Sequence, residues 1–483
     1  MKTLFPPYFV RLWLPMASVL WSGCTAIPEA APPRLDTVLS SSYHHADMTR
    51  RDAEYLQWWS TFNDPALSAL IDKALGSNHD VKIALTRIRA ARAGADAHNS
   101  RLWPTIDLKS SLSSERTTLP TRYKQGMPDV QAAQAGIGVA WEIDLGGGVR
   151  AAADAAHSEA LVSEYAAEGT RLLIASETAR EYFILRGAQR RIDLLRELAD
   201  NRHRRASLIK RRFDEGEGSR IELDLAEAEA DALEAQIPTM QTLLDVTQSR
   251  LAILTGENPS LEAVRNDPQY VWPKSPEIGT GQPIDLLRRR PDLMAAEAHY
   301  RAQTLRVAEA ASQRWPKIFL NALIGSEDLR INGANLAPIA LSNVGLMFAL
   351  PVFNAGRIRA GIDAESARER EALLSWQKGV VVAVKEVEDS LSRRSGEMRR
   401  GEVLRGYVGN LRNALLRSES LYREGEIGKP AFYDAKRSVL GGEIDLADHE
   451  TQRLLADVEL YKALGGGWNV PKTSLGGDEK EIR

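Results

Sequence analysis

The sequence predicts a mainly α-helical protein with a smaller β portion, built from two copies of one helix–β-hairpin–long helix–helix unit. The first observation is a repeat: Trp103-Pro104 returns as Trp315-Pro316, and Phe-Asp-Glu-Gly-Glu at 213–217 returns as Tyr-Arg-Glu-Gly-Glu at 422–426, in the same order. The second is one very long stretch without proline in each copy. The third is a pair of segments in each copy where apolar residues alternate with small or polar ones. Repeats this long indicate a duplicated structural unit, not the short repeats of a solenoid.

The composition favours long helices and argues against nucleic acid as a partner. The 483 residues would fill two or three ordinary domains, and they include 62 basic and 65 acidic side chains. With balanced charge and no basic stripe, the sequence lacks the electrostatic footprint of a nucleic-acid-binding protein. Hydrophobic residues make up 43% of the chain and aromatic residues 6%, and Ala, Leu, Glu and Arg are abundant, a mixture typical of long helices.

Residues 1–23 predict an export signal peptide. They carry two basic residues and then an apolar stretch that is too short and too poorly flanked to span a membrane. Cys24 follows; it is the one cysteine of the chain, so no intramolecular disulfide can form. Ser22-Gly23-Cys24 resembles a bacterial lipobox, in which the cysteine thiol is lipidated and becomes the mature N-terminus. The alternative is an ordinary secretory signal cut nearby, for example after Ala26.

The mature chain is expected to begin with an extended lead segment, 24–60, that ends in the Trp58-Trp59 pair. Repeat 1 then spans 61–259. Its first helix starts at Asp64-Pro65, an N-cap residue followed by a proline in the first turn, and runs to about Asn99. The first copy therefore opens with a helix.

Two β-strands are predicted next in each copy. Apolar and small or polar residues alternate there with a period of two, the pattern of a strand whose sheet has two unlike faces. A hairpin packed on a soluble core would give the same pattern. The strands are predicted near 103–114 and 134–145 in the first copy, joined by a polar segment, and near 316–326 and 342–352 in the second.

A very long helix and a return helix complete each copy. Glycine-rich corners follow the hairpins, and the helices after them cover 150–213 and 357–424, with apolar residues at the spacing of helix-on-helix packing. Glycine then marks a reversal of the chain, and the return helices run to about Leu254 and Leu464. An inter-repeat linker (260–282) leads into repeat 2 (283–468), and a polar tail (469–483) ends the chain.

Strands of about ten residues have the length needed to cross a bilayer. Four strands cannot close a barrel, because membrane barrels start at eight strands, and open sheet edges are not tolerated in lipid. If these strands span a membrane, several chains must share one barrel: two chains give eight strands around a filled interior, and three give twelve around a channel. The small and polar set Gly136, Gly138, Ala140, Ser342 and Gly345 is expected to face the wet lumen.

Several motifs carry a family resemblance. The most specific is Leu-Leu-Arg-Arg-Arg-Pro-Asp-Leu-Met-Ala-Ala-Glu at 286–297, supported by the segments 141–146, 350–357 and 460–468. With these motifs the chain resembles the TolC-type outer-membrane efflux factors, and within them the NodT-like lipoprotein branch, whose second repeat opens with a motif like 286–297. The resemblance covers essentially the whole mature chain.

The resemblance implies a homotrimer in which four strands per chain form a twelve-stranded membrane β-barrel, continued by a long periplasmic α-helical barrel. It implies a passive outer-membrane channel of a tripartite, resistance-nodulation-division type efflux system that exports small molecules with a periplasmic adaptor protein and an inner-membrane pump. Acyl chains such as palmitate on Cys24 would add an anchor in the outer membrane. Two alternatives stay open: the outer-membrane duct of a type I protein secretion system, which has the same architecture, and a soluble periplasmic coiled-coil scaffold.

The resemblance also places a channel gate at Asp434, on the periplasmic side of the second return helix. A ring of carboxylates in a narrow pore attracts cations and can open or close with small helix movements. The other acidic position of the family is Ala431 here, so a double acidic ring is not expected. The alternative for Asp434 is a solvated aspartate on a helix surface. Pro430 should stiffen or kink the same turn.

The two glycine-marked turns are the expected contact with the adaptor. Gly216 and Gly425 permit tight turns, and the flanking cations Arg212, Arg220, Lys429 and Arg437 are available to a partner, or are simply solvated charges. The first copy has Ile221 and Leu225 where the second has Pro430 and Asp434, so the second turn is the expected gate. The family markers Arg289, Arg290 and Asp292 are interpreted as structural residues at the junction of the repeats.

No enzyme, metal site or cofactor is predicted. The eight histidines show no metal-ligand spacing, and no nucleophile elbow or phosphate-binding loop is recognisable. The glycine runs at 146–148 and 465–467 are interpreted as chain corners.

Overall fold

The computed structural model describes residues 33–35, 39–44, 57–116, 118, 129–259, 264, 267 and 270–467. The predicted signal peptide, Cys24 and the tail 469–483 lie outside the described residues. Two compact units are present: Met1–Arg34, Ile88–Ser163 and Ala295–Trp376 form unit 1, and Leu35–Arg87, Glu164–Met294 and Gln377–Arg483 form unit 2. Each unit takes segments from both sequence repeats, so the repeats are not separate domains.

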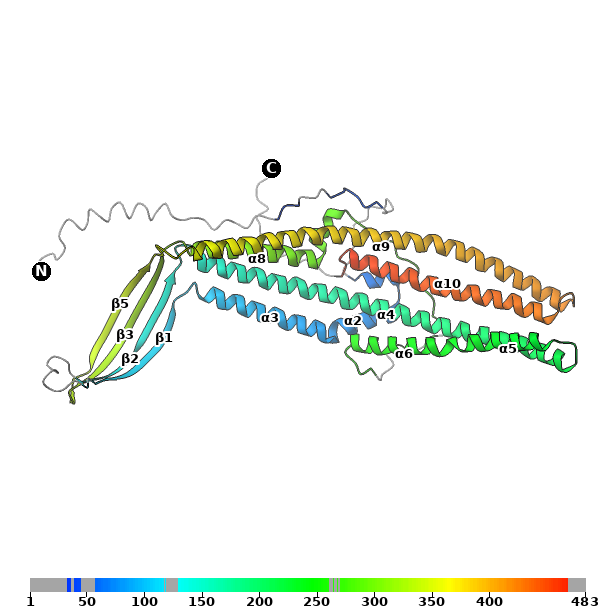
Figure 1. The fold of residues 1–483 in the computed structure, drawn as a ribbon, viewed down its shortest axis with the longest axis horizontal. Coiled ribbons are helices and arrows are strands. Elements are labelled where there is room, and N and C mark those ends of the chain that lie inside the picture. The colour runs from blue at the N-terminus through cyan, green and yellow to red at the C-terminus, as the bar shows by residue number, and fades with distance from the viewer. Residues whose placement is uncertain are drawn as a thin grey trace. The chain divides into compact units, whose positions relative to one another are not determined.

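Unit 1 contains one antiparallel sheet (Figure 1). Its strands are β1 (Thr105–Glu115), β2 (Val130–Ile143), β3 (Lys317–Ile331) and β5 (Ile339–Ala349), in the order β1-β2-β3-β5. The two-residue strand β4 (Ala334–Asn335) pairs with the end of β3. The β2–β3 pairing joins the two sequence copies, and β1 and β5 are left as the edges of the sheet.

The strand limits differ from the sequence prediction in a systematic way. β2 starts at Val130, earlier than predicted, and β3 continues to Ile331, later than predicted, because these two ends pair with each other. Alternation of apolar residues stops in these polar ends, but backbone pairing continues there, since it needs no side-chain pattern. β5 ends at Ala349, before Pro351, which has no N–H to donate to a ladder.

The register gives the sheet two unlike faces. One face is apolar: Leu108 pairs with Ile137, and Ile137 with Ile324. The opposite face carries Lys109, paired with Gly136, and Gly136, paired with Gly325. The prediction that Ser342 lies with the small and polar set is wrong. Ser342 pairs with Ile324 and therefore lies on the apolar face, as the period of two along β5 requires.

The first-copy helices are α2 (Pro65–Ser77), α3 (His79–Ser100), α4 (Gly148–Asp214), α5 (Arg220–Glu234) and α6 (Gln236–Leu254). The predicted helix from 64 to 99 is in fact broken at Asn78. The Asn78 side chain accepts hydrogen bonds from the Asp80 and Val81 amides at 2.7 and 3.2 Å, so it caps α3. The predicted return helix is likewise two helices. Pro238 is tolerated because it falls in the first turn of α6.

The second-copy helices are α7 (Leu286–Arg289), α8 (Pro291–Ser312), α9 (Arg357–Arg423) and α10 (Lys429–Ala463), preceded by the 3₁₀ turn η3 (Pro283–Asp285). α4 and α9 each have 67 residues, which corresponds to about 100 Å at 1.5 Å per residue. The two helices occupy corresponding places in the two copies, and their equal length reflects the sequence repeat. Among the described residues, no helix combines the length and the apolar character needed to cross a membrane.

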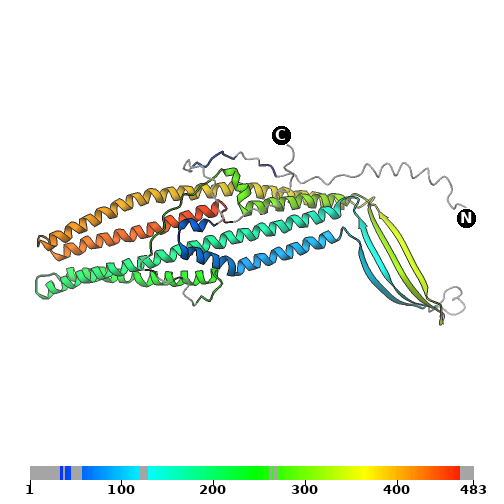
Figure 2. The same cartoon turned by 180° about the vertical axis from the view of Figure 1, so that it is seen from behind.

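In unit 2, α10 lies between α9 and α4, and α4 lies between α10 and the α5–α6 pair (Figures 1 and 2). An apolar cluster joins α4 to α10; its members are Leu194, Leu195, Leu198, Leu440, Ile444 and Ala447. The lead segment does not stay extended up to its tryptophans. Residues Trp58–Phe62 form the 3₁₀ helix η1, and Trp58 stacks on Tyr461 with ring centroids 5.2 Å apart. Burial of these large aromatic rings is favourable, and an extended segment would leave them in water.

Candidate functional site: the helical turns and the Asp434 cluster

The two turns between long helix and return helix have the same geometry. Gly216 and Gly425 have φ angles of +79° and +81°, in the left-handed region that favours glycine. In the first turn the Glu217 amide donates to the Arg212 carbonyl at 2.8 Å. In the second, the Glu426 amide donates to the Leu421 carbonyl at 2.9 Å. Both turns close α4 and α9 with the same pattern of hydrogen bonds, so the sequence repeat at 213–217 and 422–426 encodes a shared helix end.

Behind the second turn, Arg202 of α4 connects three helices. Its guanidinium is almost completely buried, with 2% of the side chain exposed. Nη1 donates to the Asp434 carboxylate of α10 at 2.9 Å and lies 3.6 Å from Glu229 of α5. Nη2 donates to the Tyr433 carbonyl at 2.7 Å, and the neighbouring Asn201 side chain accepts two further bonds. All three nitrogens of this buried guanidinium donate hydrogen bonds, and charge-assisted bonds of this kind are directional and specific.

Asp434 therefore has two cationic partners within its own chain. Besides Arg202, the Arg205 Nε atom lies 3.1 Å from the same carboxylate oxygen. The Arg205 N–H does not point at that oxygen, so this contact is an attraction between charges and not an aligned hydrogen bond. The Asp434 side chain remains 49% exposed. We call Arg202, Arg205, Glu229 and Asp434 the Asp434 cluster.

The predicted adaptor-contact cations lie at the turns, and two of them are engaged locally. Arg220 pairs with Asp224 at 2.9 Å one turn along α5, and its guanidinium carbon lies 6.0 Å from the centre of the Phe213 ring. Lys429 lies 6.0 Å from the centre of the Tyr433 ring. Pro430 is in the first turn of α10, where its missing N–H leaves no hydrogen bond broken. Arg212 and Arg437 are exposed.

The sequence interpretation missed Arg202 and Arg205. Their spacing of three residues puts both on one face of α4, which is a signal that can be read from sequence. It does not single them out, because arginine is abundant along the whole helix. Only the packing of α10 against α4 shows that this face meets Asp434.

The family markers at the repeat junction have structural contacts. Arg290 Nη1 donates to the Ala463 carbonyl at 3.2 Å, which caps the end of α10, and to Glu386 of α9 at 2.6 Å. The other side of the same guanidinium holds Asp292 through two bonds of 3.0 and 2.8 Å. Arg289 lies 3.9 Å from Asp285. These residues tie α7, α8, α9 and α10 together inside unit 2.

Within the described part of the chain, no group of three or more His, Cys, Asp or Glu side chains is arranged to hold a metal ion. Of the histidines in the described residues, His449 alone is fully buried, and its Nδ1 atom lies 2.9 Å from Glu397. Its other nitrogen faces Gly401, where an added Cβ would come within 2.3 Å. His449 therefore marks a close contact between α9 and α10.

Comparison with known proteins places this architecture in a family. The sequence matches the outer membrane efflux protein family over residues 70–257 and 283–466, so each repeat matches once and the chain belongs to this family. It is 29% identical over 452 residues to the outer membrane protein OprJ of Pseudomonas aeruginosa, covering 92% of this chain and 94% of OprJ. It is 23% identical over 456 residues to the probable outer membrane lipoprotein SilC of Salmonella typhimurium, covering 92% and 96%.

The fold matches that of solved channels. The outer-membrane channel OprN superposes with a TM-score of 0.79 at 26% identity, covering 91% of this chain and 99% of OprN. The predicted fold class and the family resemblance are thereby confirmed. The protein is an outer-membrane efflux protein, and the members of its family are channels, not enzymes.

Proposed function

We propose that three copies of this chain form a passive exit channel in the outer membrane, through which a tripartite pump expels small molecules. The observation that carries the proposal is the sheet of unit 1, which has one apolar face, an opposite face where glycines and polar residues lie among apolar ones, and two edge strands, β1 and β5. Unpaired backbone at an edge cannot lie in lipid. Pairing β1 of one copy with β5 of the next satisfies both edges, and three copies give a twelve-stranded barrel wide enough for a channel.

The Asp434 cluster is the proposed gate. Its ion pairs join α10 of the second copy to α4 and α5 of the first, so they hold the two helical hairpins of one chain together behind the turns. The Asp434 carboxylate is 49% exposed, so water can take the place of its arginine partners when an adaptor moves the helices. We propose that the channel is closed while Asp434 is held by Arg202 and Arg205, and that it opens when these contacts separate.

The turns and the N-terminus complete the proposal. Gly216, Arg220, Gly425 and Lys429 form the proposed adaptor contact, and an inner-membrane pump supplies the energy for transport. Cys24 is proposed to carry acyl chains that anchor the chain in the outer membrane. SilC, which is similar over 92% of this chain, is described as a probable outer membrane lipoprotein. Cys24→Ser is expected to abolish labelling with a palmitate analogue, while trimers still assemble through the strands.

The gate is tested by the conductance of purified trimers in planar lipid bilayers. Asp434→Asn removes the charge and keeps the shape, so the resting conductance is expected to rise several-fold. The control is Asp445→Asn in the same helix, which lies away from the cluster and should leave the conductance unchanged. Equal currents from the Asp434→Asn channel and the parent would refute the gate, and a chain that forms no trimeric pore at all would refute the channel.

A further inference from the structure

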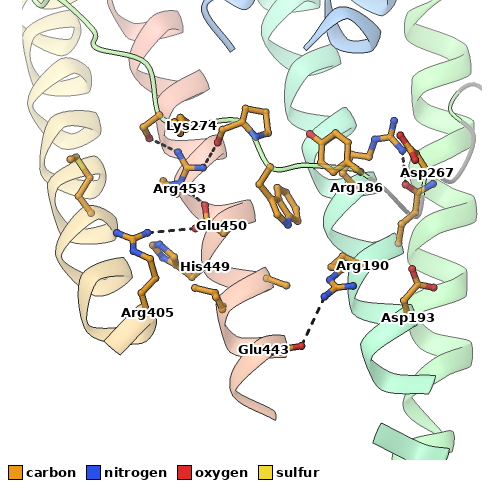
Figure 3. A pocket seen from close by; sticks show the side chains of 18 of the residues that line it. Arg186, Arg190, Asp193, Asp267, Lys274, Arg405, Glu443, His449, Glu450 and Arg453 are labelled. Carbon is orange, nitrogen blue, oxygen red and sulfur yellow. Dashed lines mark hydrogen bonds and ion pairs between the residues drawn. The ribbon is translucent and has the colours of Figure 1, made fainter. Parts of the chain in front are cut away.

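A cavity of about 650 Å³ lies along α10 in unit 2 (Figure 3). α10 forms its floor, α4 and α9 form its two walls, and linker residues 270–275 cross it as a roof. All of the lining residues belong to unit 2. Pockets for drug-sized molecules have volumes of about 300–1,000 Å³, so this cavity is large enough for a small organic ligand.

The roof of the cavity is held in place by buried groups. Arg453 of α10 donates to the Pro273 carbonyl at 2.5 Å and to the Ser275 hydroxyl at 2.6 Å. The Ser275 hydroxyl in turn donates to Asp457 at 2.6 Å. The Arg453 and Asp457 side chains are both buried, so water has little access to these bonds. The roof is therefore preformed, and a ligand does not have to order it.

Two glutamates of α10 lie on the floor of the cavity, and each already has a hydrogen-bonded arginine. Arg412 of α9 donates two bonds to Glu443, from Nε at 3.2 Å and from Nη2 at 2.9 Å. Arg453 donates from Nε to Glu450 at 2.7 Å. These are charge-assisted bonds, which are short and specific. Each glutamate is therefore neutralised by one arginine.

A second arginine lies near each of these glutamates. Arg190 of α4 is 4.0 Å from Glu443, and Arg405 of α9 is 3.6 Å from Glu450 (Figure 3). Within the described residues, neither of these two guanidiniums makes a hydrogen bond. Their side chains are 49% and 53% exposed. Since a guanidinium has five N–H donors in a planar fork, both arginines can bind an acid group of a ligand in a bidentate way.

The other charges of the lining do not cancel these two arginines. Six arginine and lysine side chains line the cavity against five carboxylates. Asp193, one turn along α4 from Arg190, is paired with Arg196 at 3.9 Å. Glu402, one turn before Arg405 in α9, would repel an anion, and the exposed Lys274 of the roof would attract one. The lining therefore favours an anionic ligand.

The cavity also offers apolar surface, above all one aromatic ring. Trp272 of the linker is half-buried and lines the cavity, together with Met398 of α9 and Leu446 of α10. The neighbouring Tyr270 ring is already occupied, because the Arg186 guanidinium lies 4.5 Å from its centre. Trp272 is therefore the ring available to a ligand. Apolar surface with a few well-placed polar groups is the usual composition of a small-molecule site.

The spacing of the two arginines indicates the kind of ligand. Glu443 and Glu450 are seven residues apart in α10, which is about two turns, or about 10 Å. Arg190 lies beside the first and Arg405 beside the second, on opposite walls. We propose that the cavity binds a small aromatic molecule with an acid group at each end, one held by Arg190 and the other by Arg405, with its ring against Trp272. This inference does not rest on the proposed channel function.

The proposal is tested by equilibrium dialysis of the purified full-length protein in lipid nanodiscs. The probe is para,para′-biphenyl dicarboxylate, in which two benzene rings separate the acid groups. It should bind saturably, about ten-fold more tightly than the biphenyl with one carboxylate, because hydrogen bonds between charged groups are the stronger ones. If the neutral biphenyl diamide binds as tightly as the diacid, apolar surface alone is sufficient and the proposal is wrong.

Variants of the two arginines show whether the binding occurs in this cavity. Arg190→Gln and Arg405→Gln should each weaken the diacid about ten-fold, to the level at which the parent binds the monoacid. Glu402→Gln removes the opposite charge one turn from Arg405 and should strengthen binding. Arg417→Gln, in α9 but outside the lining, is the matched control and should bind like the parent. Unchanged affinity in both variants of the lining arginines would overturn the proposal.

Folding and channel function are checked separately from binding. Since Arg190 and Arg405 are half exposed, their variants should keep the thermal unfolding midpoint of the parent. A protein that forms no pore but binds the diacid refutes the proposed function and leaves this inference standing. A conducting protein that does not bind the diacid refutes the inference alone.

Discussion

At the scale of the residue, partners determine what a charge can do. The sequence predicts Asp434 to be a gate carboxylate in a ring or a solvated aspartate on a helix surface, and the structure gives it two arginine partners from α4. Asp457, in the same helix, is fully buried between two other arginines. The two aspartates have the same chemistry, but water reaches the Asp434 carboxylate and does not reach that of Asp457.

An ion pair between a histidine and a glutamate in unit 1 makes the stability of the protein depend on pH. His299 of α8 lies 3.2 Å from Glu159 of α4, and the hydrogen bond to Glu159 raises the pKa of His299. The same bond lowers the pKa of Glu159. The stabilisation by charged His299 is therefore complete below its unfolded pKa of about 6.5 and is lost as the pH rises through its folded pKa. Since both groups are partly exposed, the effect is about 1 kcal/mol or less.

We expect the parent trimer to lose more thermal stability between pH 6 and pH 8 than the His299→Gln variant loses. The measurement is the shift in unfolding midpoint between the two pH values for each protein. An identical shift in both would show that the pair contributes nothing to the pH dependence.

At the scale of the element, glycine and proline set the limits of the long helices. α4 and α9 end at glycines in the left-handed conformation, and α2 and α10 begin with a proline in the first turn. These signals are local, so the sequence predicts them well. The break at Asn78 is not predicted, because Asn78 caps α3 through its side chain and the prediction follows only the apolar pattern.

The turn glycine gives a prediction with a built-in control. At Gly425 nothing lies within 4 Å of an added Cβ, so Gly425→Ala causes no clash and costs only the left-handed backbone, about 1–2 kcal/mol. Gly406→Ala, in the body of α9, also meets nothing within 4 Å and should stabilise its helix by about 1 kcal/mol. Thermal unfolding midpoints should move in opposite directions, and movement in the same direction would contradict this account of the turn.

At the scale of the whole molecule, the two faces of the sheet determine where the chain can reside. Val344 lies on the apolar face, paired with Ala322, and its neighbour Asn343 lies on the polar face, paired with Leu323. In the proposed trimer the first faces lipid and the second faces the lumen. A charge on the lipid side is unfavourable, by about 2–4 kcal/mol for basic residues at the middle of the bilayer and less for acidic ones.

Val344→Asp should therefore reduce the amount of trimer in outer-membrane fractions, while Asn343→Asp should assemble like the parent. The two variants add the same charge one residue apart, so strand propensity and expression are matched. Comparable trimer yields for both would argue against a lipid-facing sheet.

The sequence by itself determined the duplication, the long helices, the glycine turns, the four main strands and, through its motifs, the family. All of these depend on local patterns that repeat along the chain, such as the period of two in β5. Only the tertiary structure decided that Asp434 meets Arg202, that Ser275 binds Asp457, and that β2 and β3 extend into polar segments. The physical reason is that such contacts depend on the rotation and axial register of packed helices and on backbone pairing, and no single segment encodes either.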